Sequence, residues 1–516
     1  MKKHSIYEAI AKNIDANGRL NEDFSVCQAF PARNPLTSGK NSGSMHFADG
    51  AADGILLYHM DQITPKIADE ALLMRAVNRC SDRNSSQADS CFEALGASVG
   101  AVSATGRLHE FIYSHRTRLN APNLFVSAED ILFESRNIES VKFALLILEM
   151  AGPVREELRE AIRTLGLCDE FTLYAIRDML EWENGNDEVF ELAKKVRGWG
   201  RIHAVRFLEP SRPEIKKWLL DEGVDNTVMP DYSALDVWEK AGVGELLKGS
   251  VTADEFRKAG VILDALISEG PVKGISGIEN REEAVGNYLA RAKENELDAA
   301  DYERILRISK WAALEYNGFD ELCADCGDLL ASEECAQAIR EGLEQGKGLE
   351  VAEALEIDYG DSLLKCLEED FDRQYHNVTY LLRLPDYFGQ AIDVFRNRLD
   401  LEKMRALPTK ELGFGKENEK YMQLDCVVYA LADHPCEGED LVLTCLWAPG
   451  VRMRSSALRT LSEWTKALQQ PIWEVSPAAY DELKALIEKE VDRELRKRIK
   501  ALLKGVIPEP EEYENE

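Results

Sequence analysis

The sequence lacks a surplus of positive charge. Its 516 residues contain 93 acidic and 62 basic side chains, which gives a formal net charge of −31 at pH 7. Such a field repels phosphate backbones and anionic lipid surfaces, so nucleic acid and membranes are disfavoured as partners. A protein or peptide that carries a basic patch would instead be attracted. The net charge therefore predicts the sign of the charge on the partner's surface but not the partner's identity.

Long apolar runs are also missing. The first residues, Met1–Gly18, begin with two lysines, Lys2 and Lys3, that no apolar stretch follows, so we expect no signal peptide. The uncharged run Ala94–Gly106 is too short and too polar to cross a bilayer. The eleven cysteines are odd in number and irregularly spaced, a pattern typical of reduced thiols. We therefore expect a cytoplasmic protein.

Alternating strand patterns are nearly absent, whereas the helical period recurs along the chain. Ser140–Gly152 is apolar nearly all round, as expected of a helix between neighbours. Ser211–Glu214 and Thr252–Glu255 have the form of capping boxes, and Ser476-Pro477 predicts a helix that starts with proline. These patterns predict an all-α fold.

A short motif repeats at the spacing of a two-helix unit. Ala161–Leu165, Ala204–Leu208 and Ala457–Leu461 share alanine, an aliphatic residue, arginine, any residue and leucine. The first two copies lie 43 residues apart, a period typical of stacked helix pairs. We predict that the arginines lie at repeat junctions, bonded to carbonyls or carboxylates of neighbouring helices. The predicted repeat positions are Arg201, Ala204, Arg206, Leu208, Arg454, Ala457, Arg459 and Leu461.

Two of these segments, "GWGRIHAVRFL" and "PGVRMRSSALRTL", resemble the second helices of the HEAT-repeat family. The resemblance covers residues 140–225 and 425–505, is weaker over 290–405 and is absent before residue 60. Gly200 and Met453 stand where the family pattern has valine. The chain also resembles uncharacterised bacterial proteins labelled limonene hydroxylase, although no motif can be matched to that label. The HEAT resemblance implies a right-handed α-α superhelix with a concave binding face.

Breaks in the periodicity divide the chain into segments. Glycine-bearing, aperiodic stretches at 267–282 and 405–418 suggest boundaries. The predicted segments are an N-terminal, less regular helical segment with a Ser/Gly-rich loop (1–135), HEAT-like repeats (136–266), a central helical block (283–404), C-terminal HEAT-like repeats (418–505) and a disordered acidic tail (506–516).

The stretch "SGKNSGSMHFADGAADGILLYHMD" has the small residues of a phosphate-binding loop. However, Asn41 follows Lys40 where a P-loop needs serine or threonine, and no strand precedes it, so we exclude a P-loop. On a helix, His46, Asp49 and Asp53 would share one face and could bind non-haem iron or manganese. Helix capping by Ser44 or Asp49, with acids in the first turn, explains the same residues and is favoured.

Four glycines in this region and beyond it need a separate explanation. Each glycine inside a helix costs about 1 kcal/mol relative to alanine. The pairs Gly50/Gly54 and Gly96/Gly100 therefore predict the close approach of another backbone or of a ligand.

The cysteine cluster Cys323-x-x-Cys326 with Cys335 lacks the second pair of ligands that a structural zinc site needs. Its spacing is helical, so we expect these cysteines to belong to the core. The sequence contains none of the dinucleotide, zinc-protease or haem-attachment motifs, and no cofactor is predicted.

The leading hypothesis is a helical-repeat scaffold that binds a protein or peptide and has no catalysis of its own. The alternative is a metal-dependent enzyme, an oxygenase or a hydrolase, with its site near residues 46–59. A helical-repeat protein that binds nucleic acid is disfavoured because such proteins carry a basic stripe.

Overall fold

The computed structural model describes residues 4–31, 33–36, 47–60, 63–64, 66–151, 155–314, 318–413, 415 and 418–506. Within these ranges the protein is all-α: helices follow one another and the β-structure is limited to one isolated bridge, Ile14 to Leu20. The predicted fold class is therefore confirmed at this level. None of the helices in the described part of the chain is long and apolar enough to span a bilayer.

The described chain forms two compact units. The first contains the chain up to Glu296 and also Arg307–Cys326, and the second contains Leu297–Leu306 and the residues from Gly327 on. The boundary therefore runs through α18 (Ala299–Ala312) and α19 (Asp320–Leu330). This division is coarser than the five predicted segments, which stay predictions. The predicted tail falls, apart from Val506, outside the described residues.

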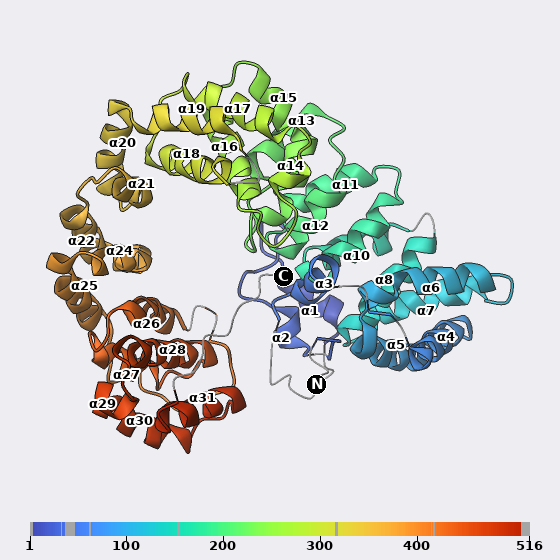
Figure 1. Cartoon of the computed structure of the whole chain (residues 1–516). Coiled ribbons are helices and arrows are strands. Elements are labelled where there is room, and N and C mark those ends of the chain that lie inside the picture. The colour runs from blue at the N-terminus through green and yellow to red at the C-terminus, as the bar shows by residue number, and fades with distance from the viewer. Residues whose placement is uncertain are drawn as a thin grey trace. The chain divides into compact units, whose positions relative to one another are not determined.

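The first unit contains the helices α1 to α17 (Figure 1). Their bounds are α1 (Ile6–Lys12), α2 (Val26–Ala29), α3 (Ala51–Tyr58), α4 (Ile67–Ser81), α5 (Ser85–Val99), α6 (Ala101–His115), α7 (Ala121–Glu134), α8 (Ile138–Leu148), α9 (Glu156–Gly166), α10 (Asp169–Leu180), α11 (Gly185–Ala193), α12 (Trp199–Phe207), α13 (Pro213–Glu222), α14 (Asp231–Ala241), α15 (Val243–Lys248), α16 (Ala253–Ile267) and α17 (Arg281–Ala292).

Helices of the first unit pack in pairs, α7 with α8, α9 with α10, α11 with α12 and α13 with α14. The second helix of each pair also packs on the second helix of the next, so that α8, α10, α12, α14 and α16 form a continuous row. Every residue of α8 is buried, as its all-round apolar sequence predicts. This row is the core of the unit.

The second unit contains the helices α20 to α31. Their bounds are α20 (Glu333–Leu343), α21 (Leu349–Ala354), α22 (Gly360–Glu369), α23 (Phe371–Gln374), α24 (Val378–Leu382), α25 (Pro385–Arg398), α26 (Glu419–Ala430), α27 (Glu439–Cys445), α28 (Val451–Leu468), α29 (Ile472–Val475), α30 (Pro477–Ile487) and α31 (Arg493–Leu503). Here α24, α26, α28 and α31 pack successively on one another and form a second row.

Two of the predicted helix starts are confirmed and one is wrong. Thr252 and Glu255 form a reciprocal capping box at α16, and Ser476 caps α30 with proline in its first turn. At α13 the residue that caps the helix is Arg212, without a side-chain bond, and Ser211 lies outside the helix. Because Pro213 is the first helical residue, the start is shifted one residue past the predicted cap.

Two repeat arginines are buried near the starts of second helices. Arg201 of α12 donates to the carbonyl oxygens of Val196 (2.9 Å) and Glu222 (3.0 Å). Val196 lies in the turn between α11 and α12, and Glu222 is the last residue of α13. The Arg201 guanidinium therefore connects the pair α11/α12 to the next pair, α13/α14.

Arg454 of α28 is enclosed even more completely. Its guanidinium pairs with the Glu490 carboxylate, and both side chains are fully buried. It also donates to the carbonyls of Ala448 (3.0 Å), Pro449 (2.5 Å) and Thr409 (2.9 Å). The remaining repeat arginines lie on rings instead: Arg206 is exposed over Tyr58 and Arg459 lies over Tyr429.

The small and aliphatic repeat positions are completely buried. This set comprises Ala204, Leu208, Ala457 and Leu461. Cys326 and Cys335 are also buried, whereas Cys323 is half-buried on α19. All eleven cysteines are free thiols.

Helix α3 lies against α12 at two glycines. A Cβ atom built at Gly54 would lie 2.4 Å from ring carbons of Trp199, and one at Gly50 would lie 2.8 Å from Trp199 Cβ. Gly50 also has a φ of +78°, which favours glycine. At Gly96 a Cβ would lie 2.3 Å from Glu139 Cβ. At Gly100 the nearest atoms are 3.5 Å away, so the positive φ of this residue, rather than a lack of space, favours glycine.

The contact of Gly54 with Trp199 gives a testable prediction. We expect Gly54→Ala to lower the free energy of unfolding by about 1–3 kcal/mol, because the methyl group overpacks the indole ring. Gly106→Ala in α6 is the matched control, since no neighbouring atom lies within 4 Å of its Cβ position. That control should stabilise the protein by about 0.5–1 kcal/mol. Equal responses in urea unfolding would contradict the packing explanation.

Candidate functional site

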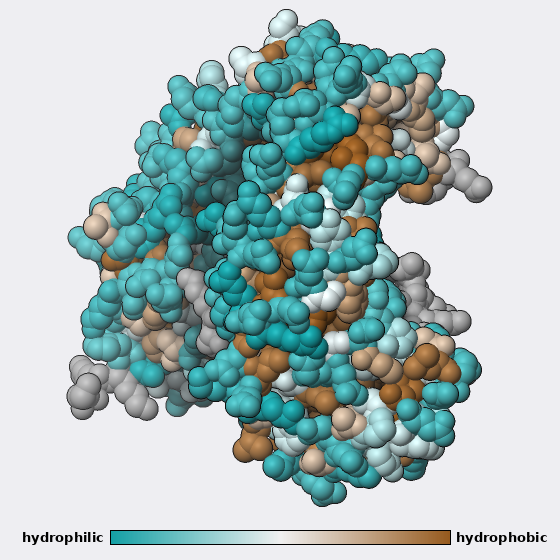
Figure 2. All heavy atoms as spheres, turned by 90° about the vertical axis from the view of Figure 1, so that its left-hand side faces the viewer, coloured by the Kyte–Doolittle hydropathy of each residue, from teal (hydrophilic) through white to brown (hydrophobic). Residues whose placement is uncertain are grey.

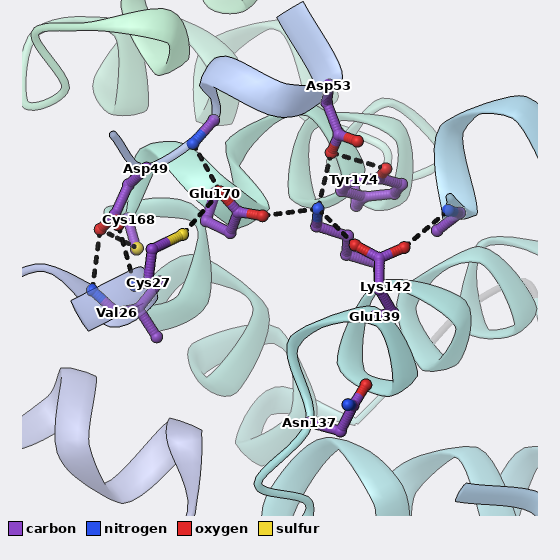
Figure 3. A network of polar contacts seen from close by, with 12 residues as sticks. Val26, Cys27, Asp49, Asp53, Asn137, Glu139, Lys142, Cys168, Glu170 and Tyr174 are labelled. Carbon is purple, nitrogen blue, oxygen red and sulfur yellow. Dashed lines mark hydrogen bonds and ion pairs between the residues drawn. The ribbon is translucent and has the colours of Figure 1, made fainter. Parts of the chain in front are cut away.

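The charged groups nearest to the predicted site converge on one buried lysine (Figure 3). Lys142 of α8 is 1% exposed and its Nζ lies 2.8 Å from Asp53, 2.9 Å from Glu139 and 2.6 Å from Glu170. These four residues, which we call the Lys142 cluster, come from α3, α8 and α10. The cluster therefore joins the N-terminal segment to the first two helices of the core row.

Two carboxylates of the cluster also receive backbone amides at helix starts. Glu139 accepts a hydrogen bond from the amide of Ala101 (2.7 Å), at the start of α6. Glu170 accepts one from the amide of Gly50 (2.6 Å), the residue that precedes α3. A carboxylate at a helix N-terminus is stabilised by the amides and by the helix dipole. Each carboxylate thus fixes the start of a helix while it neutralises Lys142.

The third carboxylate, Asp53, faces a tyrosine and a histidine. Tyr174 donates its hydroxyl to Asp53 over 2.9 Å, and both side chains are buried. Burial lowers the pKa of His203 to about 4, although the nearby Asp53 acts in the opposite direction. His203 is therefore a neutral ring at neutral pH.

One ammonium faces three carboxylates in this cluster, so complete ionisation would leave two negative charges unbalanced. Burial lowers the pKa of Lys142, but Asp53, Glu139 and Glu170 outweigh burial and raise the pKa well above its usual value. Burial raises the pKa of Glu170, only partly opposed by Lys142. The lysine is therefore charged, and burial makes Glu170 harder to ionise than an exposed glutamate.

Asp49 lies beside the cluster but has a different role. Its carboxylate accepts hydrogen bonds from the Ser25 hydroxyl (2.7 Å) and from the amides of Val26 (2.9 Å) and Cys27 (3.0 Å). Asp49 thus holds the first turn of α2. The Cys168 thiol donates to the same carboxylate at 3.5 Å.

The expectation that Asp49 and Asp53 share one helix face is wrong. Helix α3 begins at Ala51, and Gly50 before it is in the left-handed conformation, which turns Asp49 away from the helix. His46 lies outside the described residues. Among the described residues, no group of three or more His, Cys, Asp or Glu side chains is placed to bind a metal. A metal site that includes His46 stays a prediction, with both aspartates already bonded within the protein.

Asp169, the first residue of α10, is a further carboxyl group near Asp49. Burial raises its pKa to about 7, the charge of Asp49 acts in the same direction, and the amides of Gly200 and Gly198 act against them. Asp169 therefore titrates near neutral pH in the folded protein.

Sequence reasoning missed Lys142, Glu139, Glu170 and Tyr174. One signal was present: Lys142 is the only basic residue in the apolar run Ser140–Gly152, and a cation in a buried helix needs partners. No protein-family model matches the sequence, and no curated protein is significantly similar to it.

We expect Lys142→Met to lower the free energy of unfolding by about 3–5 kcal/mol at pH 7, because three buried carboxylates lose their cation. Arg155→Met is the control, since this arginine is 54% exposed and its ion pairs are at the surface. The control should cost less than about 1 kcal/mol. Similar losses in urea unfolding of the two variants would show that the cluster has no special role.

The second prediction concerns Asp169 and pH. Between about pH 4 and pH 7 the folded carboxyl group retains a proton that the unfolded chain releases, so this group makes the protein less stable as pH rises. Asp169→Asn removes the effect. Its free energy of unfolding relative to the wild type should rise by on the order of 1–3 kcal/mol across this window.

Urea unfolding at a series of pH values measures this difference. Glu157→Gln, which removes a carboxyl group that is 79% exposed, should retain the wild-type pH profile. An unchanged profile in Asp169→Asn would contradict the assignment.

Proposed function

We propose that the protein is a helical-repeat scaffold that binds a protein or peptide partner and that its helices form a right-handed α-α superhelix of the HEAT type. The observation that carries the proposal is a row of successively packed helices in each unit, α8, α10, α12, α14 and α16 in the first and α24, α26, α28 and α31 in the second. Stacked helix pairs of this kind bury their apolar faces on neighbouring pairs and leave an extended surface for binding.

The positions of the repeat arginines support the same proposal. Arg201 and Arg454 lie in the first turn of their helices and bond the carbonyls that precede those helices. Similar contacts at equivalent sequence positions in the two units are expected of a repeated structural unit.

The Lys142 cluster favours a structural role over catalysis. Its four charged side chains are buried, and their polar atoms bond to one another or to helix starts. A fully paired buried network of this kind fixes the relative positions of the helices that supply it.

The partner that we propose carries a basic patch. The charge of −31 favours approach of a cationic surface, and the free thiols lead us to place this encounter in the cytoplasm. On the face seen in Figure 2, hydrophilic side chains predominate and apolar side chains gather in separate patches between them. Charge would steer the partner, and such apolar patches would hold it.

The test is capture of partners by the full-length protein from native lysate at low and high salt, followed by kinetics with the identified partner. We expect the association rate constant to fall by about tenfold or more between low salt and 0.5 M salt, while dissociation changes less. An acidic partner, or an association rate that is indifferent to salt, would contradict the proposal.

A further inference from the structure

Three aromatic rings from different helices meet at the surface of the first unit. Tyr58 of α3, Trp199 of α12 and Tyr232 of α14 have ring centroids 4.8 to 5.9 Å apart. Trp199 is buried beneath the two half-buried tyrosines. We call these three residues the aromatic platform. The buried His203 ring stacks on the Tyr58 ring with 6.4 Å between the two centroids, so a buried side chain supports the platform.

A cation of the protein itself already lies on this platform. The guanidinium carbon of Arg206 is 5.3 Å from the centroid of the Tyr58 ring. Arg206 is exposed. Asp236 is close enough to act electrostatically on both residues. A ring face beside a carboxylate is the chemistry that recognises guanidinium and ammonium groups.

Three exposed apolar side chains are close to the platform residues in the sequence. Leu57 is 36% exposed, Met60 45% and Met229 41%. Leu57 and Met60 flank Tyr58 in the sequence, and the amide of Tyr232 bonds to the carbonyl of Met229. Methionine adapts its shape to a partner, so exposed methionines near the platform suit the aliphatic part of a lysine or arginine side chain.

Two exposed tyrosines of the described chain, Tyr113 and Tyr429, lie in simpler surroundings. Tyr113 and Tyr429 are each covered by one arginine, Arg116 at 4.4 Å and Arg459 at 4.0 Å. Among the described residues, no second aromatic ring contacts Tyr429 or Tyr113. The pair Arg459–Tyr429 therefore offers a matched control with the same chemistry and one ring instead of three.

We propose that the aromatic platform is a binding site for an arginine or lysine side chain of the partner, and that Arg206 occupies this site in the free protein. This inference rests on the proposed scaffold function and names the surface that the basic partner contacts. The partner's cation replaces Arg206 over Tyr58, and Asp236, which pairs with Lys240 over 3.3 Å in the free protein, supplies the nearby negative charge. The exchange is reversible because both the resident and the incoming cation stay at the surface.

The experiment measures the affinity of a hexa-arginine peptide for the full-length protein by calorimetry at low salt. Arg206→Ala removes the resident cation from the platform, so the dissociation constant of the peptide should fall about twofold to fivefold. This factor corresponds to the free energy of one exposed cation–π contact. Arg459→Ala removes the same charge elsewhere and should bind as the wild type does. Adding Tyr58→Leu or Tyr232→Leu to Arg206→Ala should abolish the gain, and circular dichroism establishes that each variant is folded.

Three results would overturn the inference. Arg206→Ala that binds no more tightly than Arg459→Ala would show that only net charge matters. Weaker binding by Arg206→Ala would show that Arg206 itself contacts the ligand. If none of the variants binds the peptide, the platform is not a cation site. None of these results decides the proposed function, which depends on the charge and salt response of the captured partner.

Discussion

The arrangement of the core depends on buried cations near the starts of helices. Within the described chain, four basic side chains are buried, Lys142, Arg201, Arg304 and Arg454, and each lies in the first two turns of its helix. This position is unfavourable twice, because the helix dipole repels a cation there and because burial removes its hydration. Such a cation persists only where carboxylates or carbonyls enclose it, so each one fixes the elements that supply those groups.

Three of these cations are enclosed in different ways. Arg201 is held mainly by backbone carbonyls, and Arg454 by carbonyls and one carboxylate, so both join successive helix pairs. Lys142 is held by side-chain carboxylates, one of which belongs to α3. The N-terminal segment is therefore attached to the core row by charge and by the close approach of Gly54 to Trp199, in addition to apolar packing.

Features encoded by neighbouring residues could be predicted from the sequence. The all-α fold, the capping box at Thr252 and the buried repeat positions follow from periodicity and local chemistry. The error at Asp49 arose because a helix was extended through Gly50, whose positive φ breaks it. The Lys142 cluster could not be predicted, since its carboxylates come from positions 53, 139 and 170 and meet only in the folded chain. The lone lysine in an apolar helix indicated that partners exist, without saying which.

Burial decides whether such a contact is permanent or exchangeable. Breaking a buried pair such as Lys142 with its carboxylates costs about 3–5 kcal/mol, since the remaining charges cannot reach water. An exposed cation on a ring contributes only about 0.5–1 kcal/mol, because water solvates it when it leaves. Arg206 over Tyr58 belongs to the second kind, although it is only five residues from the buried Arg201 on the same short helix. Helix α12 thus carries one arginine that is fixed in the core at its start and a second arginine that forms an exchangeable contact near its end.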